Sequence, residues 1–169
     1  MSTSVVVADW IQRIANDERE RDAVRVKEEE AVARKAALVR LNGRRLMDEL
    51  RATVTRDTEA FREEFAGDRR RDIVLEATEP GGGFTVRKPA PPAVALTVSP
   101  QPEAAIVACN YRFIPTNGLP PREHRFDLVF VEIEGEALQI KNHGTGQVFA
   151  TADALSEFLL VPVFTGRPR

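Results

Sequence analysis

The stretch AAIVACNYRFI, residues 104–114, decides the fold, because its apolar residues alternate as they do in a β-strand. Successive side chains of a strand point to opposite faces. One face of this strand is therefore expected to carry Ala105, Val107, Cys109, Tyr111 and Phe113. It is the clearest strand of the chain, and further strand-like segments precede and follow it.

A second long strand is expected at residues 124–134, where apolar residues lie on both faces, as in a central strand. Shorter strand-like segments lie at residues 73–78, 84–88, 94–99, 137–141 and 147–150. Proline and glycine separate most of them, and Pro100 is expected to end the strand before it. Short connections between strands favour antiparallel pairing. The sequence therefore predicts a six- to seven-stranded, mainly antiparallel sheet.

A short helix is expected to follow the last strand. Thr151 has the side chain of an N-cap, and Asp153 would lie in the first turn, where the helix dipole favours an acid. Leu155, Phe158 and Leu159 would then form a buried face. Pro162 is expected to end this helix.

The N-terminal part reads as one long helix. From about residue 4 to residue 66 there is no proline and only one glycine, and oppositely charged residues stand three or four apart. An apolar stripe begins at Trp10 and Ile14, fades, and resumes from Ala36 to Phe65. We therefore expect residues 32–66 to pack on the sheet, and part of residues 1–31 to project or to pack on a partner.

Asn42-Gly43 leaves two readings of this helix open. Asn-Gly is a common turn sequence and would split the segment into a helical hairpin. The apolar stripe, however, runs through Gly43 to Leu46 and Leu50 without a change of phase, which favours a continuous or kinked helix.

These elements predict an α+β protein: a long N-terminal helix packed on the sheet, with a short C-terminal helix. We divide the chain into a charged helix at residues 1–68 and a sheet domain at residues 69–169. Residues 1–72 hold 16 basic and 16 acidic residues, so this segment is dense but balanced in charge. Balanced charge is typical of a solvated helix and argues against a polyphosphate-binding surface.

The composition also bears on compartment and cofactors. Cys109 is the only cysteine, which fits a reducing compartment, and neither a signal peptide nor a membrane-spanning run is expected. The sequence therefore suggests a cytoplasmic protein. The two histidines have no partner at metal-ligand spacing, and the glycine-rich turns lack the residues of a phosphate loop, so no metal or cofactor is expected.

No catalytic residue can be assigned from the sequence. The polar residues Tyr111, Arg112 and His124 stand on strands that otherwise look like core, and they are candidates for a binding site. Cys109 is expected to be buried and structural. Arg69-Arg70-Arg71 forms a basic cluster, but Asp68 and Asp72 flank it, which argues against nucleic-acid binding.

Two functions remain as hypotheses. The first is a non-enzymatic protein–protein interaction or assembly module, in which Trp10 and Ile14 anchor the N-terminal helix on a partner or on a second copy. The alternative is a small-molecule-binding, or even catalytic, domain with a pocket between the sheet and a helix.

Overall fold

A computed structural model describes residues 8–78, 81–134 and 137–169. The chain divides into two compact units, Met1–Ala36 and Ala37–Arg169. The predicted domain boundary at residue 68 is not tested by this division and stays a prediction.

The predicted N-terminal helix is confirmed. It consists of α1 (Asp9–Leu38), the π-helical turn η1 (Val39–Gly43) and α2 (Arg44–Glu64), so it is unbroken from residue 9 to residue 64. Asn42-Gly43 therefore lies inside a helix, and Gly43 itself has helical angles, φ −62° and ψ −43°. A π turn adds a residue to the helix without ending it, so the hairpin reading is wrong.

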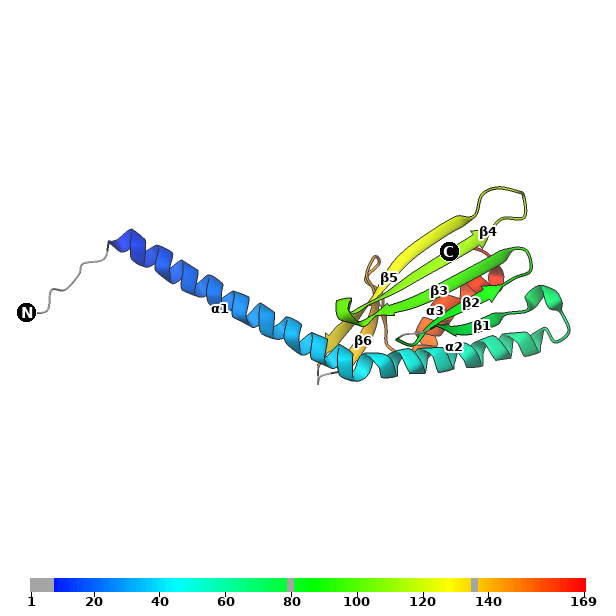
Figure 1. Cartoon of the computed structure of the whole chain (residues 1–169), viewed down its shortest axis with the longest axis horizontal. Coiled ribbons are helices and arrows are strands. Elements are labelled where there is room, and N and C mark those ends of the chain that lie inside the picture. Colours follow the sequence, from blue (N-terminus) through cyan, green and yellow to red (C-terminus); the bar gives the residue numbers. More distant parts are fainter. Residues whose placement is uncertain (1–7, 79–80, 135–136) are drawn as a thin grey trace, which may run out of the picture. The chain divides into compact units, whose positions relative to one another are not determined.

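The second unit is built on a seven-stranded sheet whose strands pair in chain order, each antiparallel to the next (Figure 1). The strands are β1 (Val74–Thr78), β2 (Gly83–Lys88), β3 (Ala93–Gln101), β4 (Ile106–Ile114), β5 (Arg122–Ile133), β6 (Ala137–Asn142) and β7 (Val148–Phe149). Two short 3₁₀ turns, η2 (Arg69–Arg71) and η3 (Pro102–Ala104), precede β1 and β4. The predicted antiparallel sheet is thus confirmed.

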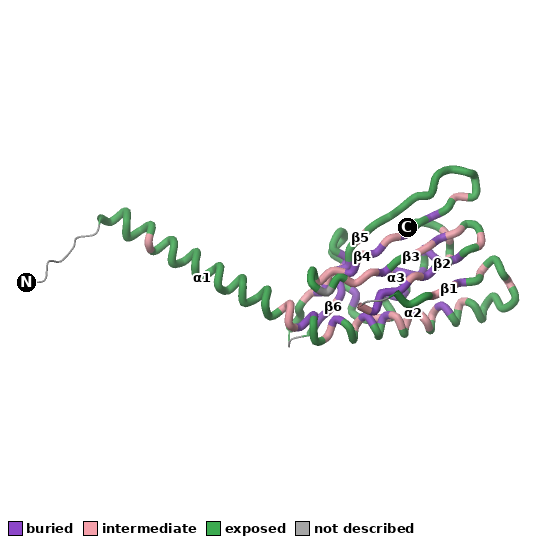
Figure 2. The backbone as a smooth tube through the Cα atoms, viewed as in Figure 1, coloured by how far each residue is buried: buried purple, intermediate pink, exposed green. Residues whose placement is uncertain are grey.

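The core of this unit lies between one face of the sheet and the helices α2 and α3 (Ala152–Thr165) (Figure 2). The alternation in β4 is as predicted, since Val107, Cys109, Tyr111 and Phe113 are all buried. From α2, Met47, Leu50 and Val54 are at most 1% exposed. The core-facing part of the long helix therefore begins later than the expected residue 32, because Val32 is 69% exposed and the first buried side chains are Leu38 and Val39.

Two expectations about proline were wrong. Pro100 does not end its strand, because β3 continues through Pro100, which pairs with Val107, to Gln101. Pro162 does not end α3, which continues to Thr165. A proline in a helix removes the N–H that would bond to the carbonyl four residues earlier. Here that carbonyl belongs to Phe158, and it accepts hydrogen bonds from Arg169 and, at 3.5 Å, from the Tyr111 hydroxyl instead.

The start of α3 is as predicted. The Thr151 side chain accepts a hydrogen bond from the Ala154 N–H at 3.1 Å, and Asp153 lies in the first turn. Leu155 and Leu159 are at most 1% exposed. The N-cap therefore fixes the first turn of a helix whose position shapes the site described below.

Candidate functional site

The first candidate is the exposed surface of α1. From Asp9 to Arg34 every residue is exposed except Ala15, which is half-buried. The predicted anchors Trp10 and Ile14 are 57% and 53% exposed, and Val24 and Val32 are also exposed. Exposed large apolar side chains repeated along one helix are typical of an interaction surface.

Four charged residues alternate with these apolar residues. At 100° per residue, Trp10, Ile14, Val24 and Val32 fall within an arc of about 80° of the helix. The same arc carries Asp17, Arg21, Glu28 and Lys35. We call these eight residues the seam of α1. The seam mixes apolar contact surface with charges of both signs, a pattern that can select a partner by charge.

The second candidate is a pocket in the sheet unit that brings Tyr111 and His124 together. Tyr111 and His124 are paired residues of β4 and β5, so their side chains are neighbours on one face. They line a pocket of about 400 Å³ together with Phe113, Arg122, Glu123, Phe126, Asn142, Thr145, Phe158, Pro162, Pro168 and Arg169. This volume lies at the lower end of the range for small-molecule sites.

Arg112 does not line this pocket. It is exposed and alternates in β4 with the inward-facing Tyr111 and Phe113, so it lies on the opposite face of the sheet. Of the three predicted binding residues, the structure therefore brings together Tyr111 and His124 and leaves Arg112 apart.

Tyr111 contributes its ring to the pocket, not its hydroxyl. The ring is 3% exposed and stacks with Phe113 and Phe126 at centroid distances of 5.6 and 5.8 Å. The hydroxyl donates to the carbonyl of Leu159 in α3. Burial raises the pKa of Tyr111 well above its ordinary value. The phenol is therefore a neutral donor that ties β4 to α3.

Several residues of the pocket were not identified as site residues from the sequence, among them Asn142, Phe158, Pro168 and Arg169. They come from the end of β6, from α3 and from the C-terminal segment, and no spacing in the sequence connects them with Tyr111 or His124. Phe158 was expected only as a core residue of the helix. The guanidinium of Arg169 lies 4.0 Å from the centroid of its ring, a cation–π contact that nothing in the sequence signals.

Cys109 is buried, as expected, and is 3% exposed. Burial raises the pKa of its thiol well above the ordinary value, and the nearby Asp127 acts in the same direction. The thiol is therefore held in its protonated, unreactive form.

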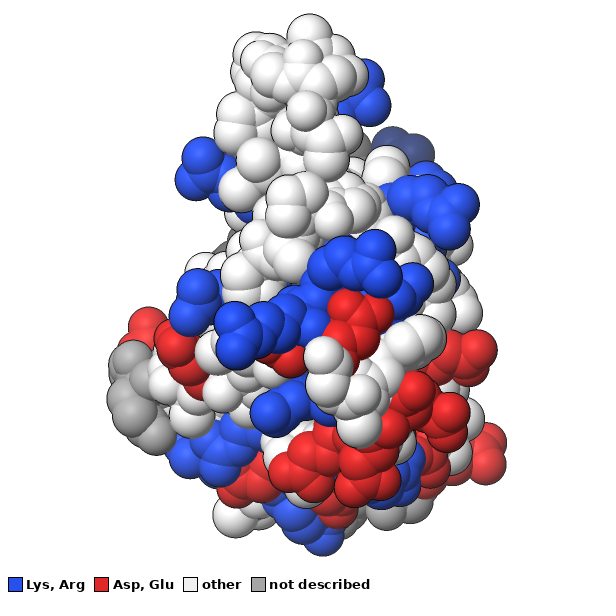
Figure 3. Space-filling model, turned by 90° about the vertical axis from the view of Figure 1, so that its right-hand side faces the viewer, with Lys and Arg blue, Asp and Glu red and all other residues white. Residues whose placement is uncertain are grey.

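The basic clusters are paired with acids. Arg44 and Arg45 lie near Asp48 and Glu49, at 3.0 and 3.9 Å, and Arg71 lies 2.7 Å from Asp68. Figure 3 views the end of the sheet unit where the β4–β5 connection projects, and Lys and Arg there lie between an uncharged projection and a group of Asp and Glu. The charges of this face are thus mixed in sign, which does not favour a nucleic-acid surface.

Within the described ranges, no helix is long and apolar enough to cross a membrane. The same part of the chain contains no group of three or more His, Cys, Asp or Glu residues placed to hold a metal ion.

No protein-family model matches the chain, and no match was found among curated proteins or among solved structures.

Proposed function

We propose that this protein is an assembly module in which α1 pairs with α1 of a second copy, in antiparallel orientation. The observation that carries the proposal is the exposure of α1: between Asp9 and Arg34 only Ala15 is even half-buried. An isolated helix gains little stability from its own sequence, and most helices in proteins depend on packing of an apolar face. A partner helix supplies that packing.

The charges of the seam argue for antiparallel pairing. In a parallel, in-register pair each seam residue faces its own copy, so Asp17, Arg21, Glu28 and Lys35 would each meet a like charge, which is destabilising. In an antiparallel pair the order of one seam is reversed, and opposite charges can meet instead.

One register satisfies these charges. A two-fold axis between Val24 and Arg25 is equally distant from Arg21 and Glu28, so Arg21 of each copy lies opposite Glu28 of the other. Val24 then lies next to Val24 of the other copy at the centre.

The outer residues of the seam also find partners in this register. Asp17 lies opposite Val32, one helical turn from Lys35, and Ile14 packs on the aliphatic stem of Lys35.

The present partner of Arg21 does not oppose this pairing. Arg21 lies 3.1 Å from Glu18, but both side chains are more than half exposed, at 77% and 57%. Exposed pairs of this kind contribute about 0–1 kcal/mol. The guanidinium can therefore exchange Glu18 for a glutamate of the second copy at little cost.

A charge swap tests the proposal. The two-fold axis makes the contact between residues 21 and 28 occur twice. Arg21→Glu therefore places a glutamate opposite Glu28 in both contacts, and Glu28→Arg places an arginine opposite Arg21 in both. Each single change is expected to weaken self-association about tenfold, and the double variant to restore it, because the pair is rebuilt with reversed signs. Sedimentation equilibrium over a range of concentrations measures the dissociation constant.

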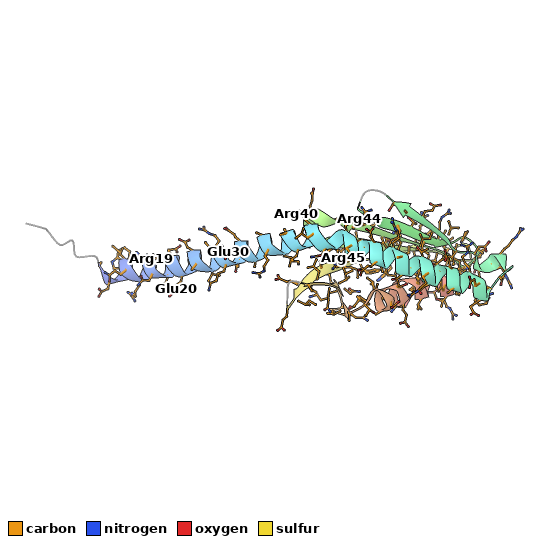
Figure 4. The ribbon with its side chains drawn as sticks, turned by 90° about the horizontal axis from the view of Figure 1, so that it is seen from below. Arg19, Glu20, Glu30, Arg40, Arg44 and Arg45 are labelled. Carbon is orange, nitrogen blue, oxygen red and sulfur yellow. The ribbon has the colours of Figure 1, made fainter. Side chains whose placement is uncertain are left out.

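Arg19 and Glu30 provide the matched control. They lie on the side of α1 opposite the seam, and Figure 4 labels both along the helix. Arg19→Glu and Glu30→Arg are expected to leave self-association unchanged. A chain that stays monomeric up to about 1 mM, or single variants no weaker than the controls, would contradict the proposal. If the chain is monomeric and binds a different protein through Trp10, the proposed self-assembly is wrong and α1 serves assembly with another protein instead.

A further inference from the structure

We propose that the pocket at Tyr111 and His124 binds a small organic anion with an apolar, aromatic body, such as an aryl carboxylate. This inference does not depend on the assembly function of α1, because every residue of the pocket belongs to the sheet unit. It rests on three features: aromatic walls, an excess of cationic groups at the open end, and a buried amide with unused donors.

The walls of the pocket are aromatic on both sides. Tyr111, Phe113 and Phe126 come from the inner face of β4 and β5, and Phe158 comes from α3 on the other side. Phe126 and Phe158 meet edge to face at a centroid distance of 5.8 Å. A planar apolar ligand gains from stacking and from edge-to-face contacts with such walls.

The open end of the pocket is cationic. Arg122 and His124 are exposed and lie on the same face as Phe126, since alternate residues of β5 point the same way. Neither has an ion-pair partner among the described residues. Glu123 also lines the pocket, but it alternates with Arg122 and His124 along β5, and its carboxylate lies 3.2 Å from Arg125. The acid at this end is therefore neutralised, and Arg122 remains available to bind an anion.

Arg169 adds a second guanidinium from the C-terminal segment. Its Nη2 donates to the carbonyl of Phe158, and at 3.5 Å to that of Glu157, while the guanidinium lies over the Phe158 ring. An arginine has five N–H donors, so donors remain after these bonds. Arg122 and Arg169 both line the pocket, and their fork-shaped donors match the two oxygens of a carboxylate.

Asn142 supplies a buried polar group. It is 4% exposed and lines the pocket. Its Oδ1 accepts the N–H groups of Gly144 and Thr145 at 2.9 and 3.2 Å, which leaves the two N–H donors of Nδ2. Those donors have no hydrogen-bond partner within the described ranges. Because Asn142 lines the pocket, a ligand oxygen could accept a hydrogen bond from this amide. Because the protein offers hydrogen-bond donors here, the complementary group of a ligand is an acceptor such as a carboxylate.

The test uses the full chain and two probes that differ only in charge. 2-Naphthylacetate is the anion, and 2-naphthylacetamide is its neutral counterpart. In ¹⁵N-resolved NMR titrations, we expect the anion to shift the amide signals of β4, β5, α3 and the β6–β7 turn in a saturable way. The neutral amide is expected to bind about tenfold more weakly, because it loses the charge-assisted hydrogen bonds.

Arg122→Gln and Arg112→Gln form a matched pair of variants, since the two arginines are exposed on neighbouring strands but lie on opposite faces. Arg122→Gln is expected to weaken binding of the anion about tenfold, and Arg112→Gln to leave it unchanged. His124→Gln is a second variant at the open end, and it is expected to weaken binding severalfold.

Three results would overturn the proposal: no saturable shifts up to the solubility limit of 2-naphthylacetate, equal affinity for the two probes, or equal effects of Arg122→Gln and Arg112→Gln. None of them bears on the self-association of α1, so the two proposals fail separately.

Discussion

The helices α1 and α2 differ sharply in burial although both are dense in charge. In α2, Met47, Leu50, Val54 and Thr58 are buried, and they repeat every three or four residues. In α1 between Asp9 and Arg34 no residue is buried. What differs is the continuity of the apolar stripe, because charged residues interrupt it in α1. Charge density alone therefore does not tell a core helix from an exposed one.

The two helices also draw stability from different sources. The apolar face of α2 is removed from water against the sheet and α3, which contributes about 1.5–3 kcal/mol for each large side chain. The described contacts of α1 include pairs of Arg25 with Asp22 and Glu29 at 3.5 and 3.8 Å. Such exposed pairs contribute about 0.2–0.5 kcal/mol each. A change in α2 should thus affect folding, and a change in α1 should affect association.

The largest difference is expected between Leu50→Ala and Trp10→Ala. Leu50 is 1% exposed in the core, so its truncation should lower the free energy of unfolding by about 2–5 kcal/mol. Trp10 is 57% exposed, and its truncation should change that free energy by less than about 0.5 kcal/mol. Urea denaturation, followed by circular dichroism at low protein concentration, measures both. A similar loss in the two variants would remove the distinction between the helices.

The sequence predicted this contrast because it depends on local periodicity. The alternation of residues 104–114 and the stripe through Leu46 and Leu50 are both visible without coordinates. Two errors concerned Pro100 and Pro162. A proline is costly because of its missing N–H and its ring, and at Pro162 contacts from elsewhere in the chain offset part of that cost. For Pro162 these are donors from Tyr111 and Arg169 to the carbonyl of Phe158.

A smaller effect is expected from Ser156→Ala, which removes a hydrogen bond between the helices of the core. Ser156 in α3 is fully buried, and its hydroxyl donates to Oδ2 of Asp57 in α2 at 2.7 Å. Its loss leaves a part-buried carboxylate oxygen without that donor, so we expect a loss of about 1–2 kcal/mol in the free energy of unfolding.

The matched control lies in α1, where Asn16 accepts a hydrogen bond from Arg19 at 2.9 Å in an exposed position. Asn16→Ala should change the free energy of unfolding by less than about 0.5 kcal/mol, because water replaces the lost bond. If Ser156→Ala were equally neutral, the bond between α2 and α3 would not contribute to their packing.

The pocket was less predictable than the fold. Tyr111 and His124 could be singled out because polar residues on a core-like strand are unusual. Their neighbours could not, since Asn142, Phe158 and Arg169 come from the end of β6, from α3 and from the C-terminal segment. A single sequence shows no correlation between such distant residues. Arg112 was included on the same ground as Tyr111 and His124, although strand alternation alone sets it on the opposite face from Tyr111.

The smallest effect is expected at Asp68, just beyond the end of α2, and it depends on pH. The backbone N–H of Arg70 holds the pKa of this carboxyl below its ordinary value, with further contributions from the side chains of Arg71 and Arg70. The fold therefore favours the carboxylate. Its contribution to stability is fully present above the pKa of the unfolded chain, about 3.9, and is lost as the pH falls through the lowered pKa of the folded chain.

Asp68→Asn should consequently lower the urea midpoint at pH 7, and the difference from the unchanged chain should shrink as the pH is lowered below about 4. Glu18→Gln in α1 is the comparison, since Glu18 accepts a hydrogen bond from the exposed side chain of Arg21. It should alter the midpoint little at either pH, because an exposed pair contributes little to folding. A loss for Asp68→Asn that stays constant through the acid range would mean that Asp68 acts through the shape of its turn rather than through its charge.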